Sequence, residues 1–560
     1  MKSPRSLLIF GLLVTNFLAA TGLLAQASFD VRAFGAKGDG QTLDTPAINQ
    51  AIAAAADAGG GTVIFPSGNY LSYSIRLKSN ITLLIGPGAT IIGAESPPIG
   101  QPGGYDPAEP NASSQFQDFG HSHWHNSLIW GEDLHDVSIT GPGRIYGRGL
   151  SRGNSRIALP VNIPPPPLPG DIPPDALAAD GPFDVTPRPD LIAGPFGYPN
   201  ARDTQSDGVG NKAIALKNCR NITLRDFSIL HGGHFGILAT GVDNLTLDNL
   251  IIDTNRDGMD IDSCANVRIS NCSINTLWDD GLCLKASYGL GVLKLTENVT
   301  ITNCYVSGYD EGTLLDGTRQ RKLTHRGGSM GRIKLGTEAS GGFRNITISN
   351  CVFDSCRGLA LEQVDGGILE DITVSNITMR NVQNAPIFIR LGARLRSPGV
   401  TQPGSVRRIL INNLVASNVA PEHGILIAGL PGHPIEDVVL SNIQIHYAGG
   451  GTSEQAARTV PELEKAYPDP YDFGTLPSWG LFARHVKGLQ LRGVELRLDK
   501  PDARPAITLD DTIDVNLRNI DFDAAEKQPA WSLTNVSLHA RDVTRLPNGN
   551  RSTLSIRELR

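Results

Sequence analysis

The middle of the sequence repeats one short phrase, an Asn or Asp followed by alternating apolar and polar residues. The first copies begin at steps of 23 and 22 residues and later copies at longer steps, as if loops were inserted at one corner of a repeating unit. A period of this length is typical of a solenoid, in which each repeat buries its apolar face only against its neighbours. The copies are Asn221-Ile-Thr-Leu, Asn244-Leu-Thr-Leu, Asn266-Val-Arg-Ile, Asn298-Val-Thr-Ile, Asn345-Ile-Thr-Ile and Asp371-Ile-Thr-Val.

The repeat consists of short β-branched runs interrupted by Gly and Asn, which is strand and turn composition. Because no helical pattern separates these runs, the sequence predicts an all-β fold, a parallel β-helix. Residues 44–58 are the exception: Thr45-Pro46 opens an Ala-rich stretch with helical periodicity. We expect this short helix to cover the N-terminal open end of the solenoid, where strand edges would otherwise be exposed.

Carboxylates are unusually dense between residues 255 and 285. Stacked coils of a β-helix lie about 4.8 Å apart, so the repeat spacing can be converted into a distance. We therefore expect Asp257 to lie beside Asp279 and Asp280 on adjacent coils of one face. Carboxylates this close repel one another and raise at least one pKa, which keeps one acid protonated beside ionised bases. The positions thirteen residues after each repeat Asn are His234, Asp257, Asp279 and, across an insertion, Glu311.

Two further residues near this cluster have weaker assignments. Asp260 alternates with Met259 and Ile261, so it faces outward and is expected to contact substrate or to support the site. His234 either lines the cleft or packs as an ordinary histidine. Other Asp residues of the repeat are explained by solenoid turns, in which Asp and Asn side chains bond the local backbone.

The N-terminal 27 residues have the pattern of an export signal: Lys2 and Arg5, a largely apolar run, and Ala25-Gln26-Ala27 as a cleavage motif. We expect a mature chain that begins near Ser28 and is secreted or periplasmic. Without Lys2 and Arg5 the formal charge of −7 becomes −9, which attracts neither nucleic acid nor an anionic membrane. A solenoid grows by adding coils, so residues 28–560 are expected to form one catalytic domain, as a monomer.

Two segments interrupt the repeat. Residues 154–210 are rich in proline and predict a long surface loop. Residues 449–479 contain four aromatic side chains that either stack on sugar rings or pack against the solenoid. These aromatic residues are Tyr467, Tyr471, Phe473 and Trp479.

Cysteine and histidine patterns argue against a metal centre. Four of the seven cysteines directly follow an Asn within the repeat, which predicts an interior column of buried thiols, with a local bridge between Cys351 and Cys356 as an alternative. The stretch from Gly120 to His125 has three histidines but lacks partners at ligand spacing. We expect no metal ligands. The four cysteines are Cys219, Cys272, Cys304 and Cys351.

Two motifs one coil apart resemble those of glycoside hydrolase family 28, the polygalacturonases and their relatives. The family carries Asn-Thr-Asp-Gly, matched here by Asn255-Arg256-Asp257-Gly258, and an Asp-Asp pair, matched by Asp279-Asp280. The resemblance implies a right-handed parallel β-helix of the pectin lyase type. It also implies hydrolysis, with inversion and without a cofactor, of α-linked galacturonosyl bonds in a pectic polysaccharide or oligosaccharide. In these terms Asp279 is the general acid, and Asp257 and Asp280 position and deprotonate water.

The chain departs from the family pattern on the next two coils. The family's Gly-His-Gly has no His here: its place is taken by residues 309–312 or 329–332, with His325 between them. The family's Arg-Ile-Lys is spelled one coil early by Arg332-Ile333-Lys334, and its expected place reads Ala360-Leu361-Glu362. A Glu there repels a uronate carboxylate.

Two explanations of this departure remain open. Positive charge comes from Lys285, Arg332, Lys334, Arg390 or Arg394 on another coil, or the neighbouring sugar is not a uronate, as in rhamnogalacturonan. The alternatives to a polygalacturonase are therefore a rhamnogalacturonan hydrolase, a lyase that holds calcium through Asp oxygens, and a carbohydrate-binding solenoid without activity. The candidate substrate-binding residues are His234, Asn255, Asp260, Lys285, Glu311, Arg332, Lys334, Glu362 and Arg390.

Overall fold

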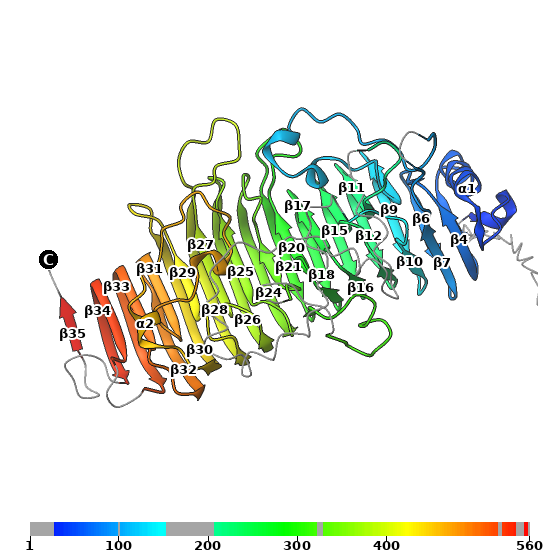
Figure 1. The fold of residues 1–560 in the computed structure, drawn as a ribbon. Helices are drawn as coiled ribbons and strands as arrows, with labels where there is room; N and C mark the ends of the chain where they lie inside the picture. Colours follow the sequence, from blue (N-terminus) through cyan, green and yellow to red (C-terminus); the bar gives the residue numbers. More distant parts are fainter. Residues whose placement is uncertain are drawn as a thin grey trace, which may run out of the picture.

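The computed structural model describes residues 27–98, 101–152, 206–321, 329–524, 529–544 and 554–557. In these residues the chain winds into an elongated right-handed parallel β-helix, with its N-terminal part at one end and its C-terminal part at the other (Figure 1). The predicted fold class is confirmed. The predicted signal segment, except for Ala27, and most of the Pro-rich insert lie outside the described residues.

Strands of successive coils pair in parallel, so that each coil adds one strand to each of three series. The series that carries the candidate site is called the site sheet. Its strands are β5 (Ile75–Arg76), β8 (Ile129–Glu132), β11 (Lys212–Lys217), β14 (Phe235–Thr240), β17 (Asp257–Asp262), β20 (Leu282–Lys285), β23 (Ile333–Leu335), β25 (Leu359–Gln363), β27 (Ile387–Leu391), β29 (Ile425–Ala428) and β31 (Leu481–Lys487), which pairs with the start of β33.

The other two series complete the coils. From β24 onward, one long strand takes the place of one strand from each of these two series. The second series is β1 (Ser28–Asp30), β3 (Gly61–Phe65), β6 (Ile81–Ile85), β9 (His135–Thr140), β12 (Arg220–Arg225), β15 (Asp243–Asp248), β18 (Ala265–Ser270), β21 (Thr296–Thr302), β24 (Phe343–Asp354), β26 (Ile368–Val382), β28 (Ser405–Val419), β30 (Ile435–Gly449), β32 (Gln490–Lys500), β33 (Ile507–Phe522) and β34 (Trp531–Val543). The third series is β2 (Asp39–Leu43), β4 (Gly68–Ser72), β7 (Ala89–Gly93), β10 (Arg144–Tyr146), β13 (Ser228–Leu230), β16 (Ile251–Thr254), β19 (Ser273–Thr276) and β22 (Tyr305–Ser307), which pairs with the end of β24. The last strand, β35 (Leu554–Arg557), pairs with β34 in antiparallel orientation.

The repeat phrase marks a corner of the coil. Its Asn adopts a left-handed backbone conformation, with φ of 56° at both Asn221 and Asn244, which Asn tolerates better than other side chains with a Cβ. The amide of Asn244 also donates to the Oδ1 of Asn221 on the previous coil at 3.0 Å, and Asn345 donates to Asn298 at 2.8 Å. The Asn therefore serves both the turn geometry and the side-chain hydrogen bonds between successive coils. These two roles explain the repeated Asn without glycosylation.

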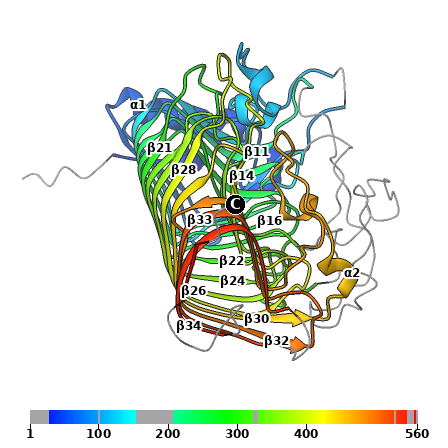
Figure 2. The same cartoon turned by 90° about the vertical axis from the view of Figure 1, so that its left-hand side faces the viewer.

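The interior of the coils is a continuous apolar core of Val, Ile and Leu side chains. Figure 2, seen along the axis, shows the coils stacked over one another around this interior. All seven cysteines are buried and free, so the interior thiols are confirmed and the alternative bridge between Cys351 and Cys356 is wrong.

Helix α1 (Thr45–Asp57) confirms the predicted N-terminal cap. It begins after Asp44, contains Pro46 in its first turn, and buries Ile48, Ala51, Ile52 and Ala55. Figure 1 shows it against the N-terminal end of the β-helix, where it covers the first coils. None of the helices among the described residues has the length and apolar character needed to cross a membrane.

The short helices among the described residues lie outside the coils, one in the N-terminal cap and the others in segments between strands. The 3-10 helix η1 (Val31–Phe34) lies close to α1 in the N-terminal cap. Two others, η2 (Ser114–Phe116) and η3 (Phe119–Ser122), precede β8, and the aromatic insert of residues 449–479 contains α2 (Ser453–Ala456) and η7 (Pro470–Phe473). Figure 2 shows the insert, in orange, outside the coils.

Candidate active site

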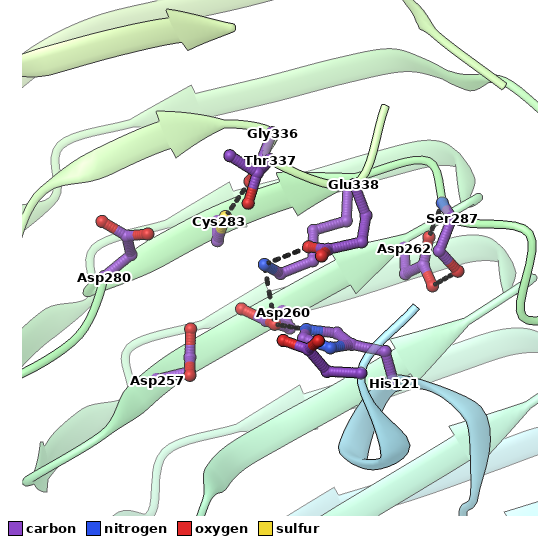
Figure 3. Close-up of polar contacts among 12 residues, drawn as sticks. His121, Asp257, Asp260, Asp262, Asp280, Cys283, Ser287, Gly336, Thr337 and Glu338 are labelled. Atoms are coloured by element: carbon purple, nitrogen blue, oxygen red, sulfur yellow. Dashed lines mark hydrogen bonds and ion pairs between the residues drawn. The ribbon is translucent and has the colours of Figure 1, made fainter. Parts of the chain in front are cut away.

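Three aspartates meet where strands of two adjacent coils begin. Asp257 is the first residue of β17, and the Gly258 N–H donates to the Asp280 carbonyl at 3.1 Å. One carboxylate oxygen from each of Asp257, Asp279 and Asp280 lies within 4.8 Å of the others. Figure 3 shows Asp257 and Asp280 on neighbouring coils. The structure thus brings together the three carboxylates that the coil spacing predicted.

Gly258 allows this close approach of the two coils. A Cβ at this position would lie 2.4 Å from the carbonyl oxygen of Gly281 and 2.5 Å from the Ile274 side chain. These distances are far below van der Waals contact, so any other residue would push the coils apart. The Gly of the Asn-x-Asp-Gly motif therefore serves the packing that places Asp257 beside Asp280.

Asp280 is buried and held by two cations from the next coil. Arg332 Nε donates to its Oδ1 at 2.7 Å, and Lys334 Nζ donates to its Oδ2 at 2.9 Å. Burial by itself would raise the pKa of this carboxyl, but the charges of Lys334 and Arg332 outweigh burial and lower the pKa well below its ordinary value. Asp280 is thus fixed as an ionised carboxylate at any working pH.

Glu362 lies behind the same two cations and is much less well bonded. Its carboxylate is 3.8 Å from Arg332 and 3.8 Å from Lys334, and neither oxygen has a hydrogen-bond partner among the described residues. Burial raises the pKa of Glu362 to about 7, although Lys334 and Arg332 oppose the rise. Glu362 is fully buried, so it balances the charge of the cations and does not offer a carboxylate to the surface.

Asp257 has the opposite electrostatic setting to Asp280. It is buried, and its nearest cation is Arg256, whose Nη2 lies 3.9 Å from the Asp257 Oδ2. Burial and the charges of Asp279 and Asp260 raise the pKa of Asp257 well above its ordinary value. Burial and the neighbouring charges therefore favour the protonated form of Asp257.

Asp279 is the most exposed of the three, with 21% of its side chain accessible. Its Oδ2 lies 2.9 Å from Arg256 Nη2, and its Oδ1 accepts the backbone N–H of Asp280 at 3.0 Å. Arg256 Nη2 also lies 2.9 Å from His234 Nε2. Burial and the charge of Arg256 lower the pKa of His234 well below its ordinary value, so His234 is neutral and accepts from the guanidinium.

A second polar network extends from Asp260 along the site sheet. His121 Nε2 lies 3.0 Å from the Asp260 Oδ2, and Lys285 Nζ lies 3.6 Å from the same oxygen and 3.0 Å from Glu338 Oε2 (Figure 3). Burial opposes the charge of Lys285, but Asp260 and Glu338 raise the pKa of Lys285 well above its ordinary value. This network joins η3, β17 and β20 and supports the floor beside the three aspartates.

The aromatic insert forms a wall at the other side of the cluster. The Tyr467 hydroxyl lies 3.2 Å from Lys334 Nζ and 3.4 Å from Thr337 Oγ1, and 44% of the Tyr467 residue is exposed. Asp469 of the insert pairs with Arg357. Lys334 Nζ also lies over the Tyr467 ring, 5.5 Å from its centroid, so Tyr467 is a partly exposed aromatic residue at the edge of the site.

Two groups of side chains have ligand atoms close enough for a metal ion. They are Asp257, Asp279 and Asp280, and Asp118, His121 and Glu338. In the first group Asp280 is already paired with Arg332 and Lys334, and Asp279 with Arg256. In the second, Glu338 pairs with Lys285, and Arg396 lies 3.6 Å from Asp118 and 3.4 Å from Glu338. In both groups, Lys or Arg side chains of the protein are thus already paired with the carboxylates, which argues against a divalent ion at either place.

Comparison with known proteins agrees with this geometry. The sequence profile described as Glycosyl hydrolases family 28 matches residues 198–465, the range that contains the three aspartates and all the candidate substrate-binding residues. The chain therefore carries a family 28 domain within residues 198–465. It is accordingly a glycoside hydrolase. A second profile, Rhamnogalacturonase A/epimerase, pectate lyase-like, matches residues 28–98.

Relatives of the chain are found among proteins named as polygalacturonases. The chain is 24% identical over 469 residues to a probable polygalacturonase of Vitis vinifera, with 80% of each chain covered. The family 28 exopolygalacturonase of Yersinia enterocolitica has the same fold, with a TM-score of 0.56 and 18% identity over 93% of this chain and 79% of that one. The exopolygalacturonase of Thermotoga maritima gives 0.52 and 22%, over 75% and 87%. At these identities the two structures support the fold alone.

The family 28 motif Arg-Ile-Lys is indeed displaced in this chain. Strand β23 pairs with β20 on one side and β25 on the other, so residues 332–334 lie one coil beyond the Asp pair, as the sequence indicated. His325, one candidate for the missing family His, lies outside the described residues. The two cations of the displaced motif bond Asp280 and are 1% exposed, so they do not reach the surface themselves.

Several predicted substrate ligands lie elsewhere in the structure. Glu311 is not on the column of Asp257, because it precedes β23 and lies in no strand of the site sheet. Its carboxylate pairs with Arg152 and His231. Arg390 on β27 donates to backbone carbonyls, including those of Glu462 at 2.8 Å and Leu463 at 2.9 Å, and so holds the insert against the sheet.

Asn255 and Glu362 are also fully buried, and the Asn255 side chain has no hydrogen-bond partner among the described residues. The substrate-binding assignments of Asn255, Glu311, Glu362 and Arg390 are corrected to positions beneath the surface or away from the cluster. Sequence reasoning overlooked Arg256, although its signal was present: Arg stands where the family 28 motif has Thr.

Proposed function

We propose that this family 28 enzyme hydrolyses α-linked galacturonosyl bonds of pectin. The observation that carries the proposal is the convergence of Asp257, Asp279 and Asp280 within 4.8 Å, beside a partly open surface. Three carboxylates in opposite electrostatic settings provide both the proton donor and the ionised bases that glycoside hydrolysis needs. The name of the Vitis vinifera relative adds support for the substrate class.

The reaction requires one acid and one base. Asp279, the most exposed of the three, gives its proton to the glycosidic oxygen as the bond between C1 and that oxygen breaks. Asp280, held ionised by Arg332 and Lys334, positions the attacking water together with Asp257, and the water gives up its proton as its oxygen bonds C1. The products are two shorter saturated chains, one with a new reducing end.

We further propose that the reaction inverts the anomeric centre, as the resemblance to family 28 implies. The nearest oxygens of the three carboxylates lie within 4.8 Å, whereas the carboxyl groups of inverting enzymes are usually about 6.5–9.5 Å apart and those of retaining enzymes about 5–5.5 Å. Proton NMR of the first product separates the outcomes: the β-anomer supports inversion of an α-linkage, and the α-anomer contradicts it.

Rhamnogalacturonan is the second candidate substrate. Two observations favour it: the profile match at residues 28–98 carries the name of a rhamnogalacturonase, and Arg332 and Lys334 are too buried to bind a second uronate. A sugar chain in which every other unit is neutral needs fewer cations on the protein.

One assay distinguishes these functions. The mature protein is incubated with polygalacturonate and, separately, with rhamnogalacturonan, while reducing ends and ultraviolet absorbance are followed. New reducing ends without unsaturated product support hydrolysis, and the better substrate identifies the linkage. Unsaturated product would indicate a lyase, and no product from either glycan would favour a binding solenoid.

Export is part of the proposal, because pectin is an extracellular substrate. The charged, apolar and Ala-Gln-Ala pattern of the N-terminal 27 residues supports it. Expression of the full chain, followed by fractionation and N-terminal sequencing, should give a processed protein outside the cytoplasm that begins near Ser28. An unprocessed cytoplasmic protein would contradict export.

A further inference from the structure

Four cations lie around the three aspartates, and they differ in their access to the surface. The side chains of Arg332 and Lys334 are each 1% exposed, that of Lys285 is 5% exposed, and that of Arg256 is 15% exposed. Of the four cations, Arg256 therefore has the greatest access to a substrate carboxylate. The other three cations are already bonded to protein carboxylates beneath the surface.

Arg256 also lies where the bond is cleaved. It follows Asn255 in the turn between β16 and β17 and contacts Asp279 through two nitrogens, Nη2 at 2.9 Å and Nε at 3.1 Å from the Oδ2. Neutral His234, stacked on Phe235 with ring centroids 4.2 Å apart, supports the guanidinium from the previous coil. The residue is thus oriented by Asp279 and His234, and 15% of its side chain is exposed.

The contact between Arg256 and Asp279 conflicts with the role of Asp279 as an acid. A carboxylate that accepts from a guanidinium is favoured in its ionised form. Burial and charge favour the proton on Asp257, whereas the proposed reaction needs it on Asp279. Something in the bound complex must release Asp279 from Arg256.

We propose that Arg256 binds the carboxylate of the galacturonate unit at the scissile bond, and that this contact moves the proton of the site from Asp257 to Asp279. The inference rests on the proposed function, since it needs a uronate substrate. A guanidinium matches a carboxylate in a bidentate geometry, so a uronate is the ligand that competes best with Asp279. The enzyme would then acquire its acid only when an acidic sugar is in place.

The proton count balances in this sequence of steps. The proposed sequence starts with the proton on Asp257, whose pKa is raised by burial and by the charges of Asp279 and Asp260. When Arg256 turns to the substrate carboxylate, Asp279 loses its counter-charge and takes the proton that Asp257 releases, because their oxygens lie within 4.8 Å. Asp279 then protonates the glycosidic oxygen, and the ionised Asp257 and Asp280 accept the water proton. No further reactant is needed.

The test compares wild type with Arg256→Thr, which restores the family 28 motif, and with Arg256→Lys. The substrates are oligogalacturonides and the same oligogalacturonides as methyl esters, which lack the negative charge. Arg344→Thr is the matched control, because Arg344 pairs with Glu297 at 2.6 Å on β24 and β21, away from the site sheet. The ratio of kcat/KM for acid over ester is measured for each protein.

Wild type and Arg344→Thr should prefer the acid by about 10-fold to 100-fold, the range for a hydrogen bond to a charged group. Arg256→Thr should lose that factor on the acid, bringing the ratio near one, and Arg256→Lys should restore part of it. An unchanged ratio in Arg256→Thr, or a wild-type ratio near one, overturns the inference while cleavage of the oligogalacturonide still upholds the proposed function. If wild type cleaves no pectic substrate, both fail.

The pH profile supplies a readout that a purely structural role would not move. Asp279 lies close to Arg256 in the turn before β17, to Asp257 at the start of β17, to Asp280 beside it and to Tyr467 of the insert. Of these groups, Arg256 is the cation in contact. Removing that cation favours the protonated acid in the free enzyme. The basic limb of kcat/KM should therefore move to higher pH in Arg256→Thr and stay in place in Arg344→Thr. A basic limb shared by all the proteins would contradict the inference.

Discussion

Glu362 and Asp280 contact the same two cations, and exchanging each for its amide should have opposite effects on stability. Asp280 accepts from Arg332 at 2.7 Å and from Lys334 at 2.9 Å, whereas Glu362 lies 3.8 Å from both and has no hydrogen-bond partner among the described residues. The ion pairs of Asp280 are well formed, whereas Glu362 carries the free-energy cost of burying a charge without the hydrogen bonds that would offset it.

The pKa of Glu362 sets the size of the effect. It rises from an ordinary value of 4.5 to about 7, which corresponds to about 3 kcal/mol at about 1.4 kcal/mol for each pH unit. Because the folded state holds this proton more tightly than the unfolded state, stability is highest below pH 4.5 and falls as the pH rises through 7. Glu362→Gln keeps the shape of the protonated acid and removes the charge, so it should abolish this loss.

Urea denaturation at pH 5 and pH 8 tests the reasoning. Glu362→Gln should be within about 1 kcal/mol of wild type at pH 5 and more stable by up to about 3 kcal/mol at pH 8. Asp280→Asn is the control: it leaves two buried cations without their partner and should cost about 3–5 kcal/mol at both pH values. The reasoning is refuted if Glu362→Gln is less stable than wild type by the same amount at both.

Three further predictions concern the site and the core. Asp279→Asn should lower kcat by about 10²-fold to 10⁴-fold with an unchanged circular dichroism spectrum, because an amide keeps the shape and cannot deliver the proton; full activity would remove Asp279 from the acid role. Lys334→Met takes away one of the two cations that lower the pKa of Asp280, so that pKa should rise and the variant should lose relative activity at the acidic end of the pH profile; a profile of the same shape as that of wild type would show that Asp280 is not used as an ionised base. Ellman's reagent should find seven thiols in denaturant and almost none in the native protein, since every cysteine is buried and unpaired; fewer than seven in denaturant would indicate a disulfide.

The repeat allowed most of the fold to be predicted because it encodes the corner of the coil directly. An Asn with a left-handed backbone and an amide ladder is needed once in each coil, so the phrase returns at the coil period. Strand type, the helix at the N-terminal end and the interior thiols follow from local pattern alone. The meeting of Asp257 with Asp280 followed as well, since no insertion separates their coils.

The predictions that failed did so for two physical reasons. Counting along the repeat holds only while coils have similar lengths. The sequence insertion between β22 and β23 breaks the count, and Glu311 lies outside the site sheet, where it pairs with His231 and Arg152. Burial of a charged residue also depends on what covers the sheet. Arg390 is hidden because the insert lies over it, and its contacts with the Glu462 and Leu463 carbonyls have no signature in the sequence around either.

In a β-helix, a cationic side chain on one coil can pair with a carboxylate on a neighbouring coil. Strands of neighbouring coils lie about 4.8 Å apart, a distance that a Lys or Arg side chain easily spans. Lys334 pairs in register with Ala360, two residues before Glu362, and from its own coil it reaches Asp280 directly. The Glu at the place of the family Lys then balances the relocated cation from behind. The buried charges thus remain balanced, while the task of meeting a substrate carboxylate is left to the more accessible Arg256.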